Sequence, residues 1–203
     1  MAAICRSTII KEGTPFTSEW SLRSLRNSHA VYVGIYIPFI SEWLRRSAGI
    51  CNRCCFTGHR PEKLHKPEEQ IKKDLEVAIL QAVDDGFVTF ISGMARGVDI
   101  WAAEIVLRLR ESNPVIHLVA ASPYRGFEIR WSADWQSRYN AILQQADLVK
   151  FICPGYSRDC FQRRNEWMVD RSSRVIAVYN GELGGTRNTI EYAKAKIVEC
   201  VLA

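Results

Sequence analysis

The feature that most constrains this sequence is a regular alternation of short apolar runs and amphipathic segments, which begins near Gly49 and continues to the C-terminus. The apolar runs are "CNRCCFTG", "FVTFIS", "VIHLVAA", "DLVKFI", "RVIAVYN" and "IVECVL". Because they are apolar throughout and alternate with helical segments, they are typical of parallel strands covered on both faces. With right-handed crossovers, the pattern predicts an α/β fold built on a doubly wound, mostly parallel sheet.

The segments between these runs have the spacing of amphipathic helices. In "PEEQIKKDLEVAILQAVDDG" the apolar positions recur every three or four residues, and Gly86 ends the helix; these positions are Ile71, Leu75, Ala78, Ile79 and Ala82. A later helix has Tyr139, Ile142, Leu143 and Ala146 on one face. The predicted helices after the first are Asp99–Glu111, Trp131–Ala146, Cys160–Arg171 and Thr189–Lys196.

The part of the chain before Gly49 has no comparable pattern. Residues 1–30 show little sustained period, and "VYVGIYIPFISEWLRRS" predicts a strand followed by a short helix. A chain of 203 residues that is 47% hydrophobic can bury one sizeable core. We therefore expect one domain over residues 51–203, and an N-terminal extension of unknown role and little order over residues 1–50.

Charge and cysteine content exclude several classes of function. The net charge of +5 is unevenly spread, +3 over residues 1–50 and +2 over residues 51–203. This is a weak basis for a nucleic-acid-binding face, which usually needs clustered basic residues. The longest apolar run, Ala30–Ile40, is shorter than the roughly 20 residues of a membrane helix, and the first 20 residues lack the apolar core of a secretory signal. The seven cysteines form no zinc-binding pattern. We expect a cytoplasmic protein with reduced thiols and no metal.

Polar, glycine-rich turns follow the predicted strands. They read "TGHRPEK", "SGMARGVD", "SPYRGFEIRW", "CPGYSRDCFQRRN" and "NGELGGTRNT". In doubly wound folds ligands bind beyond the carboxyl ends of the strands, so these turns are expected to converge there. They also carry arginines, at positions 60, 96, 125, 130, 164 and 187. Backbone amides at helix N-termini together with guanidinium groups suit an anion, most often a phosphate.

Each of these residues also has a purely structural interpretation. Gly58 and Gly93 can simply supply turns, and Asp99 is placed to be the N-cap of the helix that follows it. Asn188 and Glu191 have the spacing of a capping box, in which the carboxylate reaches back to the amide of the cap residue. At this stage both interpretations stay open.

Several blocks of the sequence resemble one family. They are "CCFTGHRPEKL", "SGMARGVDIWAAE", "RWSADWQSRYNAIL", "CFQRRNEWMVDRSSRVIAVYNG" and "GGTRNTIEYA". Together they are similar to the YpsA-like family of the SLOG superfamily, whose Rossmann-like members include DprA and the Lonely Guy phosphoribohydrolases. The resemblance runs from Cys54 to the C-terminus and does not include residues 1–50.

This resemblance implies a Rossmann-like fold with a pocket for a nucleotide or a nucleotide-derived ligand at the strand ends. No other cofactor is implied, and the expected partner is a small molecule; a homo-oligomer is compatible with the sequence. The candidate ligand-binding residues are Thr57, Gly58, His59, Arg60, Ser92, Gly93, Met94, Ala95, Gly97, Asp99, Pro123, Arg130, Asn165, Gly184, Gly185, Thr186 and Thr189.

Similarity to the phosphoribohydrolases also suggests catalytic candidates. Arg164 falls at the position of their helix arginine, and Glu191 lies seven residues after Gly184, like the glutamate in their "PGGxGTxxE" motif. The chain departs from that motif, with Leu183 for the proline and Arg187 for the third glycine. Three hypotheses follow. The first is binding or sensing of a nucleotide-like ligand, the second is cleavage of the N-glycosidic bond of a nucleoside monophosphate, and the third, least favoured, is DprA-like DNA binding.

Overall fold

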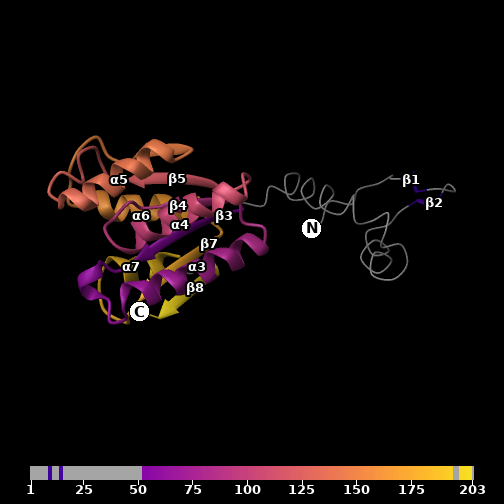
Figure 1. Ribbon diagram of the computed structural model, residues 1–203, viewed down its shortest axis with the longest axis horizontal. Helices are drawn as coiled ribbons and strands as arrows, with labels where there is room; N and C mark the ends of the chain where they lie inside the picture. Colours follow the sequence, from indigo (N-terminus) through magenta and orange to yellow (C-terminus); the bar gives the residue numbers. More distant parts are fainter. Residues whose placement is uncertain (1–8, 11–13, 16–51, 194–196, 203) are drawn as a thin grey trace. The chain divides into compact units, whose positions relative to one another are not determined.

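The computed structural model describes residues 9–10, 14–15, 52–193 and 197–202 (Figure 1). Contacts divide the chain into two units, Met1–Ile50 and Cys51–Ala203, and each is described by itself. In the first unit, β1 (Ile9–Ile10) pairs with β2 (Thr14–Pro15) in antiparallel orientation. The strand and short helix predicted over residues 31–47 lie outside the described residues.

The second unit is built on one six-stranded parallel sheet. Its strands are β3 (Arg53–Gly58), β4 (Thr89–Ser92), β5 (His117–Ser122), β6 (Leu148–Phe151), β7 (Arg174–Tyr179) and β8 (Ile197–Leu202). Their order is β6-β5-β4-β3-β7-β8, and every neighbouring pair is parallel. The chain therefore moves outward from β3 to β6 and then returns to place β7 on the other side of β3. The predicted doubly wound, Rossmann-like fold is confirmed.

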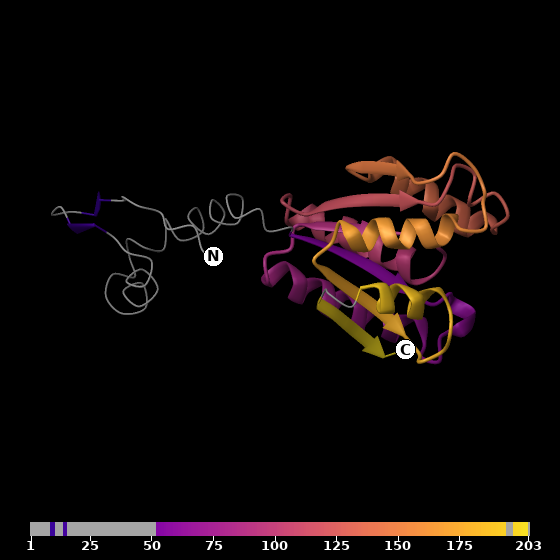
Figure 2. The same cartoon turned by 180° about the vertical axis from the view of Figure 1, so that it is seen from behind.

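Helices cover both faces of this sheet. The helical elements are η1 (Pro61–Lys63), α3 (Glu68–Asp84), α4 (Val98–Ser112), α5 (Ala133–Gln145), α6 (Cys160–Asp170) and α7 (Gly185–Tyr192). The α3, α4 and α5 helices lie over one face (Figure 1), whereas α6 and α7 lie over the other, which faces the viewer in Figure 2. Parallel strands need such crossovers, because a short hairpin cannot return the chain to the same end of the sheet.

Two apolar layers result, one on each face of the sheet. The side chains of Cys54 and Phe56 belong to the core under α3, α4 and α5. Cys55, which lies between them on β3, belongs to the core under α6, together with Met168 and Val175. This double burial explains why the strands are apolar throughout rather than alternating. Burial raises the pKa of the Cys54 thiol well above its ordinary value, so this cysteine acts as a small apolar side chain.

The predicted helices are all present, but some begin or end at residues other than those predicted. All five apolar positions predicted for α3 are buried. The α5 helix begins at Ala133, two residues after the predicted start at Trp131. The last helix differs most, since α7 begins at Gly185 rather than Thr189. The glycines had suggested a turn, but Gly184, at φ 153°, is the N-cap, so the helix starts directly at the second glycine.

Candidate functional site

A cavity of about 300 Å³ lies at the carboxyl ends of the strands. It is next to the boundary between β3 and β7, where the strand order reverses and where doubly wound sheets bind ligands. Its walls come from the turns after β3, β4, β5 and β7 and from the first turns of α6 and α7. The lining residues are Phe56, Thr57, Gly58, His59, Arg60, Lys63, Ala95, Arg96, Asp99, Phe127, Trp131, Phe161, Arg164, Asn165, Gly184, Gly185 and Thr186.

The N-terminus of α7 forms one wall of the cavity. The first amides of an α-helix have no partner within the helix, and the helix dipole adds partial positive charge there. Gly184 and Gly185 are exposed, and a Cβ atom added to either would meet no atom within 4 Å. Thr186 follows them and is buried. This wall therefore combines free amide donors with open space, which is the arrangement that binds phosphate at helix N-termini.

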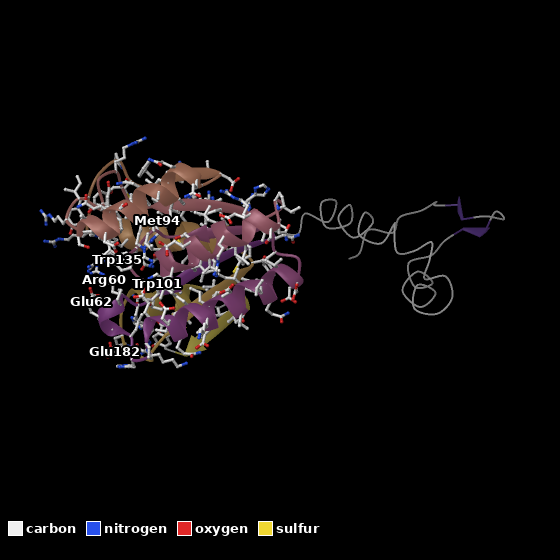
Figure 3. The ribbon with its side chains drawn as sticks, viewed as in Figure 1. Arg60, Glu62, Met94, Trp101, Trp135 and Glu182 are labelled. Carbon is white, nitrogen blue, oxygen red and sulfur yellow. The ribbon has the colours of Figure 1, made fainter. Side chains whose placement is uncertain are left out.

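Basic side chains surround this helix end, and most have a carboxylate partner. Lys63 Nζ lies 3.5 Å from Glu182 Oε2, and Arg96 Nη2 lies 3.2 Å from Glu62 Oε1. Arg60 has no ion-pair partner among the described residues. Figure 3 shows Arg60, Glu62 and Glu182 at the same end of the domain. The mouth of the cavity is thus a set of exposed ion pairs with one uncompensated arginine.

The floor of the cavity contains a buried ion pair. Arg164 Nη1 lies 3.3 Å from Asp99 Oδ2, and both side chains are less than one tenth exposed. Arg164 also donates a short hydrogen bond to the carbonyl of Gly93. Burial raises the pKa of Asp99, an effect that Arg164 opposes, and burial lowers the pKa of Arg164. A guanidinium held in this way clamps the turn after β4 to α6 through Nη1. Arg164 Nε and Asp99 Oδ1 are buried and have no hydrogen-bond partner among the described residues.

Asp99 is not the N-cap that its sequence position suggested. Gly97, at φ 90°, is the N-cap of α4, and Asp99 lies in the first helical turn. Its Oδ2 accepts a hydrogen bond from the amide of Ala95 at 3.2 Å, as well as pairing with Arg164. The Asp99 carboxylate therefore bonds back from the first helical turn to an amide before the helix. An N-cap side chain would instead lie before the helix and accept a hydrogen bond from an amide inside it.

Four other candidates of this turn shape the loop and do not line the cavity: Ser92, Gly93, Met94 and Gly97. The Ser92 hydroxyl accepts a hydrogen bond from the Met94 amide at 3.1 Å and donates one to the Asp99 carbonyl at 2.7 Å. A Cβ on Gly93 would lie 2.7 Å from Asp99 Oδ2 and closer still to Arg164. A Cβ on Gly97 would lie 2.7 Å from Pro61 Cδ. These two glycines are needed for close packing of the loops.

His59 also lines the cavity. It is 5% exposed, and its ring stacks on Tyr179 with 5.6 Å between ring centroids. Burial lowers its pKa, and the charge of Lys63 lowers it further. The imidazole is therefore neutral at neutral pH, and it presents a flat, uncharged surface beside the cations.

An aromatic wall also lines the cavity, and the sequence reasoning missed it. It consists of Phe127, Trp131 and Phe161, whose rings meet edge-on or tilted, with centroids 4.9 Å apart for Phe127–Trp131 and 5.5 Å for Phe127–Phe161. Asn165 lies one helical turn after Phe161 on α6 and also lines the cavity. The stretches "GFEIRW" and "CFQRRN" could have predicted these aromatic residues, because they lie beside arginines that were already expected at the strand ends.

Four further candidates lie away from the cavity lining: Pro123, Arg130, Thr189 and Glu191. Glu191 is 52% exposed and accepts a hydrogen bond from Arg187 Nε at 2.9 Å. The capping-box interpretation is also wrong, because Asn188 lies within α7 and its amide bonds to the Gly184 carbonyl at 3.0 Å. The helix begins earlier than predicted, so the proposed cap and its carboxylate both fall inside it.

Two absences hold for the described residues. No group of three or more His, Cys, Asp or Glu side chains is placed there to hold a metal ion. Within the same residues, no helix has the length and apolar character needed to cross a membrane.

The fold and cavity define a class: Rossmann-like α/β proteins with a basic, glycine-lined cavity at the point where the strand order reverses. Comparison with known sequences then identifies the family. The model of the YspA SLOG family (YpsA) matches residues 54–200, and the chain belongs to this family. It is 33% identical over 149 residues to a UPF0398 protein of Bacillus cereus (strain B4264), covering 69% of this chain and 81% of that protein. A UPF0398 protein of Halalkalibacterium halodurans is 29% identical, with 69% and 79% covered.

Solved structures with a similar fold include two DNA processing proteins A. The protein from Streptococcus pneumoniae has a TM-score of 0.54 and 18% sequence identity, and the match covers 73% of this chain and 49% of that one. The protein from Helicobacter pylori, described for its single-stranded DNA binding mode, has a TM-score of 0.51 and 21% identity, with 73% and 64% covered. This chain thus spans less than two thirds of either, and the likeness shows the fold.

Proposed function

We propose that this protein binds an anionic, nucleotide-derived small molecule in the cavity between the carboxyl ends of β3 and β7. The observation that carries the proposal is the wall made by Gly184 and Gly185, where unpaired helix amides meet open space. Arg60 adds a positive charge without a carboxylate partner in the described part of the chain. The aromatic wall of the same cavity supplies a surface for a planar ring.

The geometry favours a protein that binds its ligand over one that also cleaves the ligand's N-glycosidic bond. Cleavage of an N-glycosidic bond uses a carboxylate next to the reacting carbon. Among the described residues that line the cavity, Asp99 is the one carboxylate, and it is buried against Arg164. Glu191 lies outside the lining and is paired with Arg187. Glu191 is therefore held by Arg187, and Asp99 Oδ2 by Arg164 and the Ala95 amide, whereas Asp99 Oδ1 has no hydrogen-bond partner among the described residues.

A small molecule also suits the site better than a nucleic acid. One structural neighbour is described for its single-stranded DNA binding mode. Binding along a strand needs a continuous basic groove, with successive phosphates neutralised by free cations. Here Lys63 and Arg96 already have carboxylate partners at the mouth, which reduces the positive charge offered to a strand.

The test is a titration of the full chain with AMP by isothermal calorimetry, with two leucine variants. Gly185→Leu places a side chain in the open space of the cavity, so it should abolish AMP binding while the thermal midpoint stays unchanged or rises, because glycine is a poor helix residue. Gly155→Leu is the matched control, since its Cβ also meets nothing within 4 Å but it does not line the cavity.

Three results separate the alternatives. Saturable AMP binding that is lost in Gly185→Leu and kept in Gly155→Leu supports the proposal. Release of free adenine from AMP by the unmodified chain would favour the hydrolase. Tight binding of oligo-dT that weakens steeply with salt, without binding of AMP, would favour the DNA-binding alternative.

A further inference from the structure

We propose that Glu62 and Glu182 at the mouth restrict the cavity to ligands with a single phosphate group, which makes them specificity-determining residues. This inference rests on the proposed binding function and names the ligand class more closely. It follows from how the cations of the cavity are paired, because each pairing decides whether a cation is free to meet a phosphate.

Four cations line the cavity: Arg60, Lys63, Arg96 and Arg164. Three of them have a carboxylate within 4 Å, namely Glu182 for Lys63, Glu62 for Arg96 and Asp99 for Arg164. In the described part of the chain, only Arg60 is left uncompensated. One unpaired cation and the roughly half charge of the α7 N-terminus match one phosphate group.

The three ion pairs differ in how readily they open. The Asp99–Arg164 pair is buried, so breaking it would leave an uncompensated charge in the interior. The side chains of Glu62 and Glu182 are 60% and 50% exposed. Such exposed pairs contribute at most about 1 kcal/mol, which corresponds to about fivefold in an equilibrium constant. The two pairs at the mouth therefore set the charge available to a ligand, and they can be changed without damage to the fold.

Both glutamates belong to segments that contribute other residues, Arg60, Lys63 and Gly184, to the cavity lining. Glu62 lies on η1, directly after the turn that carries Arg60, and Glu182 lies in the turn between β7 and α7. Asn180 Nδ2 donates a hydrogen bond to the Lys63 carbonyl at 2.8 Å, which joins these two segments. Arg60, Glu62 and Glu182 occupy the same end of the domain in Figure 3. Neither glutamate lines the cavity, but each holds a cation that does, so a second phosphate at the mouth would compete with these carboxylates for Lys63 and Arg96.

The size of the cavity agrees with the charge count. At about 300 Å³ it is at the lower end of the range for small-molecule sites. The cavity has two distinct walls. One planar ring can pack on Phe127, Trp131 and Phe161, and one phosphate can bind at Gly184–Thr186. The ligand class that fits both is a nucleoside monophosphate.

The experiment compares AMP, ADP and ATP by calorimetric titration of the full chain and of Glu62→Gln, Glu182→Gln and the double variant. Glu69→Gln is the control, because Glu69 is an exposed partner of Lys72 on α3 and does not line this cavity. In the unmodified chain AMP should bind at least as tightly as ADP, and ATP more weakly. Each glutamine at the mouth should raise the affinity for ADP about fivefold and that for AMP about twofold or less. These gains should shrink in high salt.

Either of two results would overturn the inference while leaving the proposed function intact. One is AMP binding with ADP or ATP bound more tightly by the unmodified chain. The other is AMP binding with the same AMP-to-ADP ratio in both glutamine variants as in Glu69→Gln. If none of the three nucleotides binds, the proposed function fails, and this inference fails with it.

Discussion

Replacing Arg164 by methionine tests whether this arginine is an interior clamp or a ligand-binding residue. The side chains of Arg164 and Asp99 are 8% and 7% exposed, so the substitution leaves a carboxylate in the interior without its cation. Removing one partner of a buried ion pair costs about 3–5 kcal/mol of stability. We expect Arg164→Met to lose this amount at pH 7, measured by urea unfolding of the full chain followed by far-UV circular dichroism.

The pH dependence of that loss identifies its cause. Burial already raises the pKa of Asp99, and loss of Arg164 removes an opposing effect. A carboxyl whose folded-state pKa lies above its unfolded value favours the folded state below the unfolded pKa and disfavours it as the pH rises through the folded pKa. The deficit of Arg164→Met should therefore be smaller at pH 5 than at pH 7. Adding Asp99→Asn should restore part of the stability at pH 7, with a coupling energy of about 0.5–3 kcal/mol.

Arg163 provides the control, because it is the neighbouring residue on α6. Its side chain is 57% exposed and lies 3.8 Å from Asp159, so Arg163→Met should cost less than about 1 kcal/mol. If Arg164→Met is no more destabilising than Arg163→Met, or if its deficit is the same at pH 5 and pH 7, the buried pair does not act as a clamp.

Three further predictions concern other parts of the chain. Arg174 donates a hydrogen bond that lowers the pKa of Asp85. The contribution of Asp85 to stability is therefore present above about pH 4 and lost at lower pH. Asp85→Asn should lower the thermal midpoint at pH 7 and have the same midpoint as the unmodified chain near pH 2. Glu191→Gln should leave AMP affinity within about twofold, because Glu191 pairs with Arg187 outside the cavity, and a hundredfold loss of any turnover would instead show that it is catalytic. A chain that starts at Cys51 should fold and bind AMP like the full chain; loss of affinity in a folded truncation would assign a role to residues 1–50.

The sheet and the position of the cavity follow from the sequence for simple physical reasons. Strands buried on both faces must be apolar throughout, and the two layers that contain Cys54 and Cys55 produce that pattern. The carboxyl ends of parallel strands lie at one edge, so the turns that contain Arg60 and Gly184 were expected to meet there, and both line the cavity.

The role of individual residues at the site depends on three-dimensional packing, which spacing alone does not reveal. Gly93 and Gly185 look alike in the sequence, yet a Cβ on Gly93 would collide with the ion pair, whereas one on Gly185 would meet nothing. Asp99 has the spacing of a helix cap, but its partner Arg164 is 65 residues away along the chain. Phe161 looked like part of a polar turn, because two of its aromatic neighbours, Tyr124 and Phe127, come from the loop after β5.

The most direct test of the proposed binding site is an NMR titration of the ¹⁵N-labelled full chain with AMP, which reports the backbone amides one by one. If a phosphate binds at the N-terminus of α7, the amide signals of Gly185 and Thr186 should show the largest shifts, and they should saturate together with those of residues on the aromatic wall. Gly155, outside the cavity, should not shift. Saturable shifts confined to another face of the domain, such as the groove that contains Trp101 and Arg108 between α3 and α4, would contradict the proposal.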